Sequence, residues 1–151
     1  MDANGATSMS DETRNGVRSV IPMLVCRDAA AEIEFCKTAF GAVERSRRSA
    51  PDGIVIHATL SIGDALIMVH GEFPNLASRA PQSDGSSSVV IYVYVDAADA
   101  VIERAVVAGA RVLIPVTNAP WGDRVGRIID PAGHVWNVAA RGGDGRKRQM
   151  V

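Results

Sequence analysis

The sequence predicts an α+β fold in which two tandem βαβββ modules form a cupped, mixed eight-stranded sheet with the helices on its outer face. Three observations predict it: short sequence identities between the two halves of the chain, a repeated order of elements, and strands that are apolar on both faces. When the chain of 151 residues is shifted by 68 positions, residues 28–30 (Asp-Ala-Ala) fall on 96–98 and residues 41–42 (Gly-Ala) fall on 109–110. These identities lie at the two ends of what we interpret as equivalent helices.

The first half of the chain is typical of a strand, a helix and three more strands. Residues 20–26 are a short apolar run with β-branched residues, as expected for a strand buried on both faces. Asp28 stands where a helix N-cap is expected, and Glu32 and Glu34 follow where the helix dipole favours negative charge. The helix carries an apolar stripe of four residues and is expected to end at a glycine: Ala29, Ile33, Cys36, Phe40 and then Gly41. Strands are expected at residues 42–47, 54–62 and 65–70.

The second half repeats this order. It predicts a strand at 89–95, a helix at 97–108 that Gly109 ends, and three strands at 111–115, 124–129 and 135–140. Residues 130–133 (Asp-Pro-Ala-Gly) join the last two strands, and a proline at the second position with a glycine at the fourth indicates a type I turn.

The expected domain plan is one domain between two tails. Residues 1–18 are a polar tail, residues 19–141 form the domain, and residues 142–151 are a flexible C-terminal tail. Within the domain, modules at 20–71 and 89–141 are joined by a linker at 72–88 that is rich in Pro, Ser, Asn and Gly. This linker is long enough either to carry function or only to cross the molecule.

Composition excludes several classes of partner. Hydrophobic residues make up 47% and charged residues 22% of the chain, and the net charge is −1, so no overall field would attract nucleic acid or an acidic membrane. No apolar run approaches the ~20 residues that a bilayer span needs. The N-terminal residues lack the apolar stretch of a signal peptide, and the two cysteines suit a reducing compartment, so we expect a cytoplasmic protein.

A βαβββ module covers one sheet face with its helix and leaves the other face uncovered. Two such modules side by side predict a cup that is lined by alternate strand residues and is suited to a small molecule. The sequence leaves open whether the modules pair within one chain or between two chains.

The ordered motifs resemble the glyoxalase/bleomycin-resistance/dioxygenase (vicinal oxygen chelate) superfamily, and most of all its PhnB-like branch. The resemblance covers about residues 20–141 and rests on the segments 20–25, 39–42, 56–64, 94–95, 109–110, 122–124 and 130–136. It implies the double-module fold, a homodimer, and a divalent metal held by His, Glu or Gln side chains from the first and last strands of each module. One scaffold of this kind hosts unrelated chemistries, so the resemblance specifies the fold better than the function.

The strands that should carry the metal ligands lack them in this chain. By the resemblance, the four ligand positions fall on Ile21, Met68, Val90 and Asn137, and only the last has an oxygen to offer. A slip of one residue in the strand register would not supply a ligand set either. We therefore expect no metal and no other cofactor.

Seven residues are candidates for ligand binding. His57 lies mid-strand and is either a donor or general base or a half-buried strand residue. A second group of candidates lies together in the chain: Trp121, Asp123 and Arg124. Its indole and guanidinium suit a planar or anionic ligand. Alternatively, Asp123 and Arg124 form a local ion pair and Trp121 covers the core. The set is completed by a phenol, an amide and a thioether: Tyr92, Asn137 and Met68.

Other polar or reactive residues are assigned structural roles. Tyr94 shares a strand face with Tyr92, and that face either lines the cup or packs under the helix. His70 is expected at the rim of the cup and His134 in the packing of its turn, while Trp136 and Cys36 are expected in the core.

The leading hypothesis is a metal-free cup that binds an apolar or aromatic small molecule, as the drug-sequestering members of the resembled family do. The alternative is a lyase, isomerase or oxygenase of the glyoxalase/dioxygenase type, with a metal on unusual ligands or a metal-free reaction at His57. A third possibility is a paralogue whose cup is vestigial and whose role is protein association.

Overall fold

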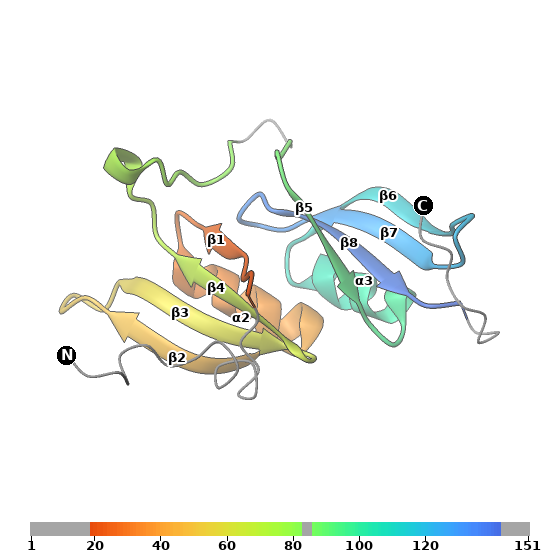
Figure 1. Ribbon diagram of the computed structural model, residues 1–151, viewed down its shortest axis with the longest axis horizontal. Coiled ribbons are helices and arrows are strands. Elements are labelled where there is room, and N and C mark those ends of the chain that lie inside the picture. Colours follow the sequence, from red (N-terminus) through yellow and green to blue (C-terminus); the bar gives the residue numbers. More distant parts are fainter. Residues whose placement is uncertain (1–18, 83–85, 143–151) are drawn as a thin grey trace.

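The computed structural model describes residues 19–82 and 86–142 (Figure 1). The tail expected at 1–18 and nearly all of the tail expected at 142–151 lie outside these residues. Among the described residues, no helix has the length and apolar character needed to cross a membrane.

The first module consists of a strand, a helix and three strands, as expected. Its elements are β1 (Met23–Val25), α2 (Ala29–Phe40), β2 (Val43–Ser49), β3 (Val55–Ile62) and β4 (Ala65–His70). The Asp28 carboxylate accepts a hydrogen bond of 3.0 Å from the Ala31 amide, which confirms the predicted N-cap. Gly41 ends the helix with φ 68°, a left-handed conformation that glycine adopts without strain. Strand β1 is shorter than the predicted 20–26, because Pro22 has no amide to contribute to the ladder.

The second module repeats this order after a short 3-10 turn, η2 (Pro74–Leu76). Its elements are β5 (Val90–Tyr94), α3 (Ala98–Val107), β6 (Arg111–Asn118), β7 (Arg124–Ile129) and β8 (Val135–Ala140). Strand β6 runs past the predicted end at residue 115. The register shifts between Ile114 and Thr117, so Pro115 falls in an irregularity where its missing amide interrupts no ladder bond.

The eight strands form two hydrogen-bonded sheets of four. The orders are β1-β4-β3-β2 and β5-β8-β7-β6, with the β1–β4 and β5–β8 pairs parallel and the other pairs antiparallel. This repeat confirms the α+β class and the tandem modules. The division into two sheets refines the expected eight-stranded sheet.

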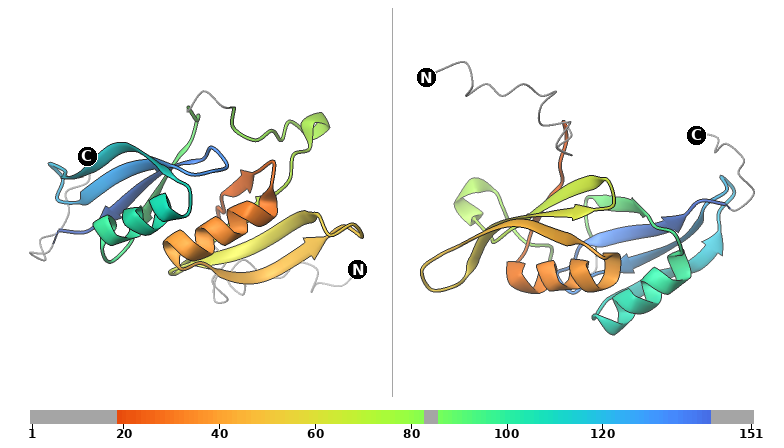
Figure 2. Two further views of the ribbon diagram at one scale, coloured as in Figure 1. Left: turned by 180° about the vertical axis from the view of Figure 1, so that it is seen from behind. Right: turned by 90° about the horizontal axis from the view of Figure 1, so that it is seen from below.

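Both helices lie on the same side of the molecule. Figure 1 shows them behind the two sheets, and they come to the front when the molecule is turned around (Figure 2). Helix α2 packs against α3, and one core cluster contains buried residues from both modules. Phe40 of α2 and Trp136 of β8 join the modules in this core, with their ring centroids 4.6 Å apart.

Each sheet therefore has one face toward the helices and one face without helical cover, which we call its open face. In β3, Ala58 and Leu60 belong to the core, so His57 and Thr59 point to the open face. In β5, Ile91 and Val93 pack on the core, so the side chains of Tyr92 and Tyr94 point the other way.

Candidate functional site

The open face of the second sheet gathers three aromatic side chains around one buried acid. Asp123 is 1% exposed, and its Oδ2 accepts hydrogen bonds from the hydroxyls of Tyr92 (2.7 Å) and Tyr94 (2.8 Å). The indole Nε1 of Trp121 donates to the same oxygen at 3.2 Å and also lies 3.2 Å from the Tyr92 hydroxyl. We call Tyr92, Tyr94, Trp121 and Asp123 the aromatic–carboxylate cluster.

Local structure explains how the chain builds this cluster. The two tyrosines alternate along β5 and so share a face, while Trp121 and Asp123 come from the β6–β7 turn. Gly122 between them has φ 102°, which a residue with a side chain rarely adopts, and this conformation turns both neighbours toward β5. The rings are about two-fifths exposed, so they present apolar plates to solvent while their polar ends are bound.

Asn137 is also on this face but serves a different partner. It lies opposite Tyr92 in the β5–β8 register, and its Oδ1 accepts a hydrogen bond of 2.7 Å from Arg127 Nε. The guanidinium of Arg141 lies over the ring of Tyr94, 5.1 Å from its centroid. This bond and this contact place two cations beside the aromatic–carboxylate cluster.

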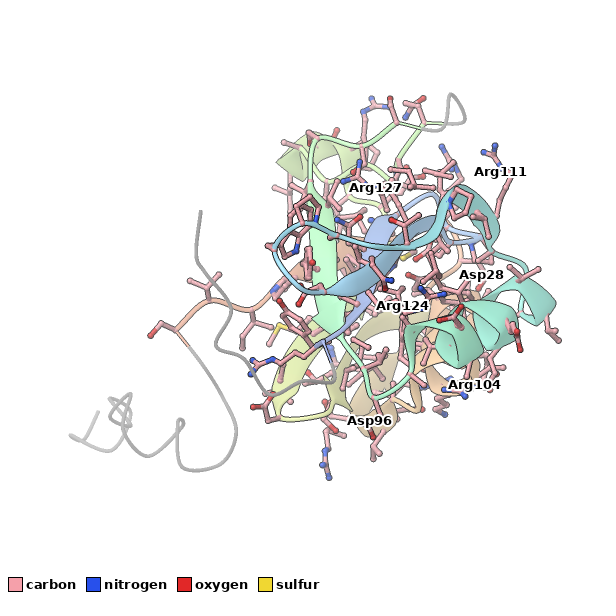
Figure 3. The ribbon with its side chains drawn as sticks, turned by 90° about the vertical axis from the view of Figure 1, so that its right-hand side faces the viewer. Asp28, Asp96, Arg104, Arg111, Arg124 and Arg127 are labelled. Atoms are coloured by element: carbon pink, nitrogen blue, oxygen red, sulfur yellow. The ribbon has the colours of Figure 1, made fainter. Side chains whose placement is uncertain are left out.

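Arg124 lies on the other side of the sheet. Its guanidinium forms two hydrogen bonds with the Asp99 carboxylate of α3, at 2.7 and 2.9 Å, and a third with Asn118. Figure 3 labels Arg124 beside α3. Successive strand residues point to opposite faces, so the neighbour of Asp123 is directed toward the helix. The structure thus does not bring Arg124 to the aromatic plates, and the local Asp123–Arg124 pair considered above does not form.

His57 and Met68 lie on the open face of the first sheet, apart from the aromatic–carboxylate cluster. His57 is directly opposite His70, and Met68 is directly opposite both Met23 and Thr59. His70 is 8% exposed and stacks on Phe73, with ring centroids 5.3 Å apart. The first face is therefore made of imidazole and thioether groups, beside the guanidinium of Arg45, which donates to Ser61 Oγ at 3.0 Å.

The positions that would hold a metal do not suit one. Met68, Val90 and Asn137 all point to open faces, as the resemblance implies, but two of them are apolar and the third already binds Arg127. Within residues 19–82 and 86–142, no three His, Cys, Asp or Glu side chains gather closely enough to bind a metal ion. The side chains at these positions therefore do not support a metal-dependent step.

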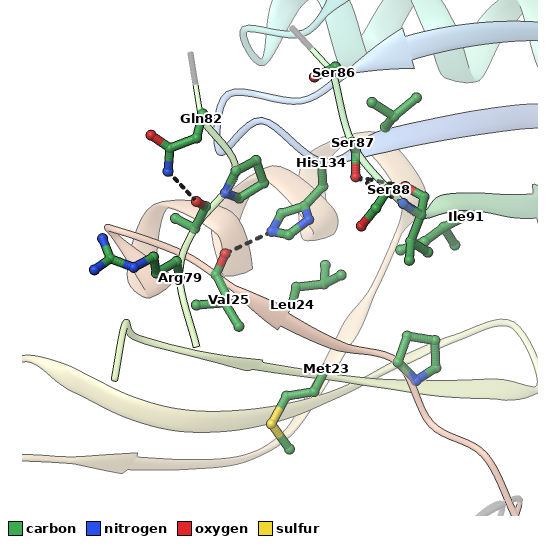
Figure 4. Close-up of a pocket in the computed structure, with 15 residues that line it drawn as sticks. Met23, Leu24, Val25, Arg79, Gln82, Ser86, Ser87, Ser88, Ile91 and His134 are labelled. Atoms are coloured by element: carbon green, nitrogen blue, oxygen red, sulfur yellow. Dashed lines mark hydrogen bonds between the residues drawn. The ribbon is translucent and has the colours of Figure 1, made fainter. Parts of the chain in front are cut away.

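A cavity of about 560 Å³ lies between the two sheets, and we call it the seam cavity (Figure 4). It is bounded by β1, the linker, the start of β5 and the β7–β8 turn, where His134 Nε2 lies 2.8 Å from the carbonyl oxygen of Val25. None of the seven predicted residues lines it. Its polar lining comes from Arg79, Gln82, His134 and residues 86–88. The length and composition of the linker were the signal for this cavity, but nothing in the sequence indicated which side chains face inward.

The two cysteines are buried and free. Burial is the main cause that raises the pKa of both the Cys26 and the Cys36 thiols, and the nearby carboxyl groups raise them further. Both thiols stay protonated at neutral pH, which makes them core residues rather than nucleophiles, as expected for Cys36.

Comparison with known proteins places the chain in a family. The profile of the Glyoxalase/Bleomycin resistance protein/Dioxygenase superfamily matches residues 19–138. A Mycobacterium tuberculosis H37Rv protein, named Uncharacterized protein Rv0887c, is 41% identical over 120 residues, which are 78% of this chain and 71% of that protein.

Solved structures share the fold. TioX from Micromonospora sp. ML1 superposes with a TM-score of 0.64 at 23% identity, covering 88% of this chain and 100% of TioX. The fosfomycin resistance protein FosX from Mesorhizobium loti gives 0.61 at 16% identity, covering 81% of this chain and 90% of FosX. With the matched profile and the repeated modules, the conclusion is that the chain belongs to the glyoxalase/bleomycin resistance protein/dioxygenase superfamily.

Proposed function

We propose that this protein binds an apolar or aromatic small molecule on its open faces without using a metal. The observation that carries the proposal is the aromatic–carboxylate cluster, in which Asp123 fixes the hydroxyls of Tyr92 and Tyr94 and the indole of Trp121. A plate of fixed, half-exposed rings offers apolar contact at little cost in side-chain entropy, because the rings are already ordered.

The surrounding surface supports an apolar ligand. Large apolar side chains are exposed on both open faces, among them Met23 (46%), Val90 (38%) and Ile114 (49%). Exposed apolar side chains on these faces can contact an apolar ligand directly.

We further propose that two copies of the chain assemble to close the cup. The two open faces of one chain look to the same side of the molecule, so they do not enclose a ligand by themselves (Figure 2). If the first sheet of one copy covers the second sheet of the other, His57 and Met68 come to face Tyr92, Trp121 and Asn137.

We further propose that the ligand is a drug-like molecule. One neighbour in fold is a fosfomycin resistance protein, which supports drug-like molecules as probes and the sequestration of an antibiotic as a role. Membership of the PhnB-like branch and a cytoplasmic location belong to the same proposal, and the free thiols of Cys26 and Cys36 agree with a reducing compartment.

A thermal-shift screen against glycopeptide, quinone and aromatic antibiotics tests ligand binding. At about 100 times Kd, binding stabilises the fold by about 2.7 kcal/mol, which raises Tm by about 5–10 °C for a chain of this size. The same compound should shift a Trp121→Ala variant less. A broad panel that shifts neither protein would remove most of the support for sequestration.

An enzymatic function is the second candidate, and it is favoured by the pairing of His57 with His70 across β3 and β4. Two imidazoles on one face could supply a general base, or part of a metal site with unusual ligands. Elemental analysis of protein purified without chelator separates the two functions. One tightly held transition metal per chain would favour the enzyme.

A further inference from the structure

Glu32 is a buried acid that the binding proposal does not use. It lies in the first turn of α2, is 1% exposed, and both of its carboxyl oxygens are buried without a hydrogen-bond donor. An ionised carboxylate in such a place is costly, because neither water nor a donor stabilises its charge. The side chain therefore needs a physical explanation.

Asp130 is the acid beside it, and it comes from the other module. It is 4% exposed and opens the β7–β8 turn. Its Oδ1 accepts the amides of Ala132 and His134, both at 2.9 Å, and its Oδ2 accepts the indole N–H of Trp136 at 2.9 Å. All of these bonds are accepted, as suits an ionised carboxylate.

The two carboxyl groups are close enough to interact as hydrogen-bond partners and as charges. Two carboxylates have no proton between them and can only repel, whereas a carboxylic acid can donate to a carboxylate. Burial first, and Asp130 second, raise the pKa of Glu32 well above its ordinary range. A proton on Glu32 thus removes its buried charge and lets its hydroxyl donate to the Asp130 carboxylate.

Among the described residues, the other titratable groups around the pair are two thiols, a further acid and the imidazole of His134, whose Nε2 lies 3.8 Å from Cys26 Sγ. The Cys26 thiol, at the end of β1, and the Cys36 thiol, on α2, feel the negative charge of both carboxyl groups and stay neutral. Asp28 caps the same helix and is itself acidic. The cations Arg27 and Arg111 line a small cavity beside Asp130, but both are exposed.

We propose that Glu32 and Asp130 share a single proton across the boundary between the modules, and that this carboxyl pair acts as a pH-sensitive latch on the β7–β8 turn. The turn carries His134, whose amide is bound by Asp130 and whose Nε2 lies 2.8 Å from Val25 O in the wall of the seam cavity. Loss of the shared proton places two negative charges side by side in the core. The repulsion loosens the turn from α2 and releases His134 from β1.

The sign of the pH effect follows from linkage. The folded pKa of Glu32 is raised above its value in the unfolded chain, so folding takes up a proton at pH values between the two. The stability from this group is fully present below the ordinary glutamate pKa of 4.5 and is lost as pH rises toward the raised value. The variant Glu32→Gln keeps the size of the side chain, donates to Asp130 through its amide, and removes the titration.

The experiment records Tm and the exchange rate of the His134 amide across about pH 5 to about pH 9, with exchange corrected for its intrinsic pH dependence. Wild-type protein should lose about 3 °C or more over this range and lose protection at His134, while Glu32→Gln stays flat in both readouts. The control Glu34→Gln makes the same change on the exposed side of α2, where Glu34 pairs with Lys37, and should behave like wild type. Equal pH dependence in wild type and Glu32→Gln would overturn the latch.

Infrared spectroscopy tests the shared proton without a variant. Wild-type protein labelled with ¹³C-glutamate should show the carbonyl stretch of a protonated carboxylic acid at about pH 7, shifted by the label. The absence of any such band, or a band that the glutamate label does not shift, would contradict a proton on Glu32.

Discussion

Asp123 organises the candidate site at the level of single residues. Its partners are two phenols and an indole, so each aromatic ring is held at its polar end while its face remains available. Removing one ring should therefore affect a ligand more than it affects the fold.

Trp121→Ala is expected to weaken binding of an aromatic ligand by about 1–2 kcal/mol, or about 5- to 30-fold in Kd, because a stacking plate is lost. Trp121 is 41% exposed, so Tm should change little. Calorimetric titration of the compound found by screening measures the affinity. Unchanged affinity would remove Trp121 from the site.

Arg124→Ala serves as the contrasting substitution. Its ion pair with Asp99 is exposed at both ends and screened by solvent, so its loss should lower the unfolding free energy only slightly, and less at high salt. Binding of the same ligand should be unaffected, because Arg124 points toward α3. A large loss of affinity in this variant would restore the role that the sequence predicted for it.

The sequence indicated part of the candidate site, and its binding role stays a prediction. The alternation of Tyr92 and Tyr94 and the Trp121–Asp123 segment indicated residues that the structure does bring together. The sequence could not show to which sheet face Arg124 points, because a polar residue at the start of a strand is compatible with either face. From the sequence, Glu32 was interpreted as a charge that interacts with the helix dipole, and its burial was not predicted. The spacing was a signal for burial, because Glu32 lies three residues after Ala29 and four before Cys36, next to the apolar stripe.

At the level of elements, the approach of α3 to the second sheet depends on a glycine. A Cβ at Gly126 of β7 would lie 2.8 Å from Ile102 Cδ1 and 3.1 Å from the carbonyl oxygen of Ile114. Backbone atoms cannot move aside without disturbing the β6–β7 ladder.

Gly126→Ala is expected to destabilise the protein by about 1–3 kcal/mol through overpacking, as measured by denaturant unfolding. The matched control is Gly71→Ala, where a Cβ would meet no atom within 4 Å and the stability should be nearly unchanged. Equal stability of the two variants would show that α3 and β6 repack freely.

The boundaries of the elements show what local patterns can and cannot predict. Strands β4, β7 and β8 begin and end at the predicted residues, because turn signals flank them. Strand β6 was predicted too short, since a proline usually ends a strand, and only the partner strand reveals that Pro115 falls at an irregularity of the register.

At the level of the whole molecule, the two open faces point to one side, and each exposes large apolar side chains. This arrangement underlies the proposal that two copies close the cup together. The sequence predicted the number and order of the strands but could not decide how the modules pair, because that depends on contacts between faces rather than on local pattern.

Ile114→Glu tests the proposed assembly, because it places a charge on the open face of the second sheet, where Ile114 is 49% exposed. Analytical ultracentrifugation should show a dimer for the wild type and a shift toward monomer for the variant. Val107→Glu, at the exposed end of α3, is the control and should remain a dimer. A monomeric wild type would contradict closure of the cup by two copies.

The central claim is that the ligand is held by these side chains without a metal. It is tested most directly by titrating the best compound from the screen into wild-type protein with and without a strong chelator. We expect the same Kd in both conditions, together with weaker binding by Trp121→Ala. Binding that disappears with the chelator and returns when a divalent metal is added would contradict the account.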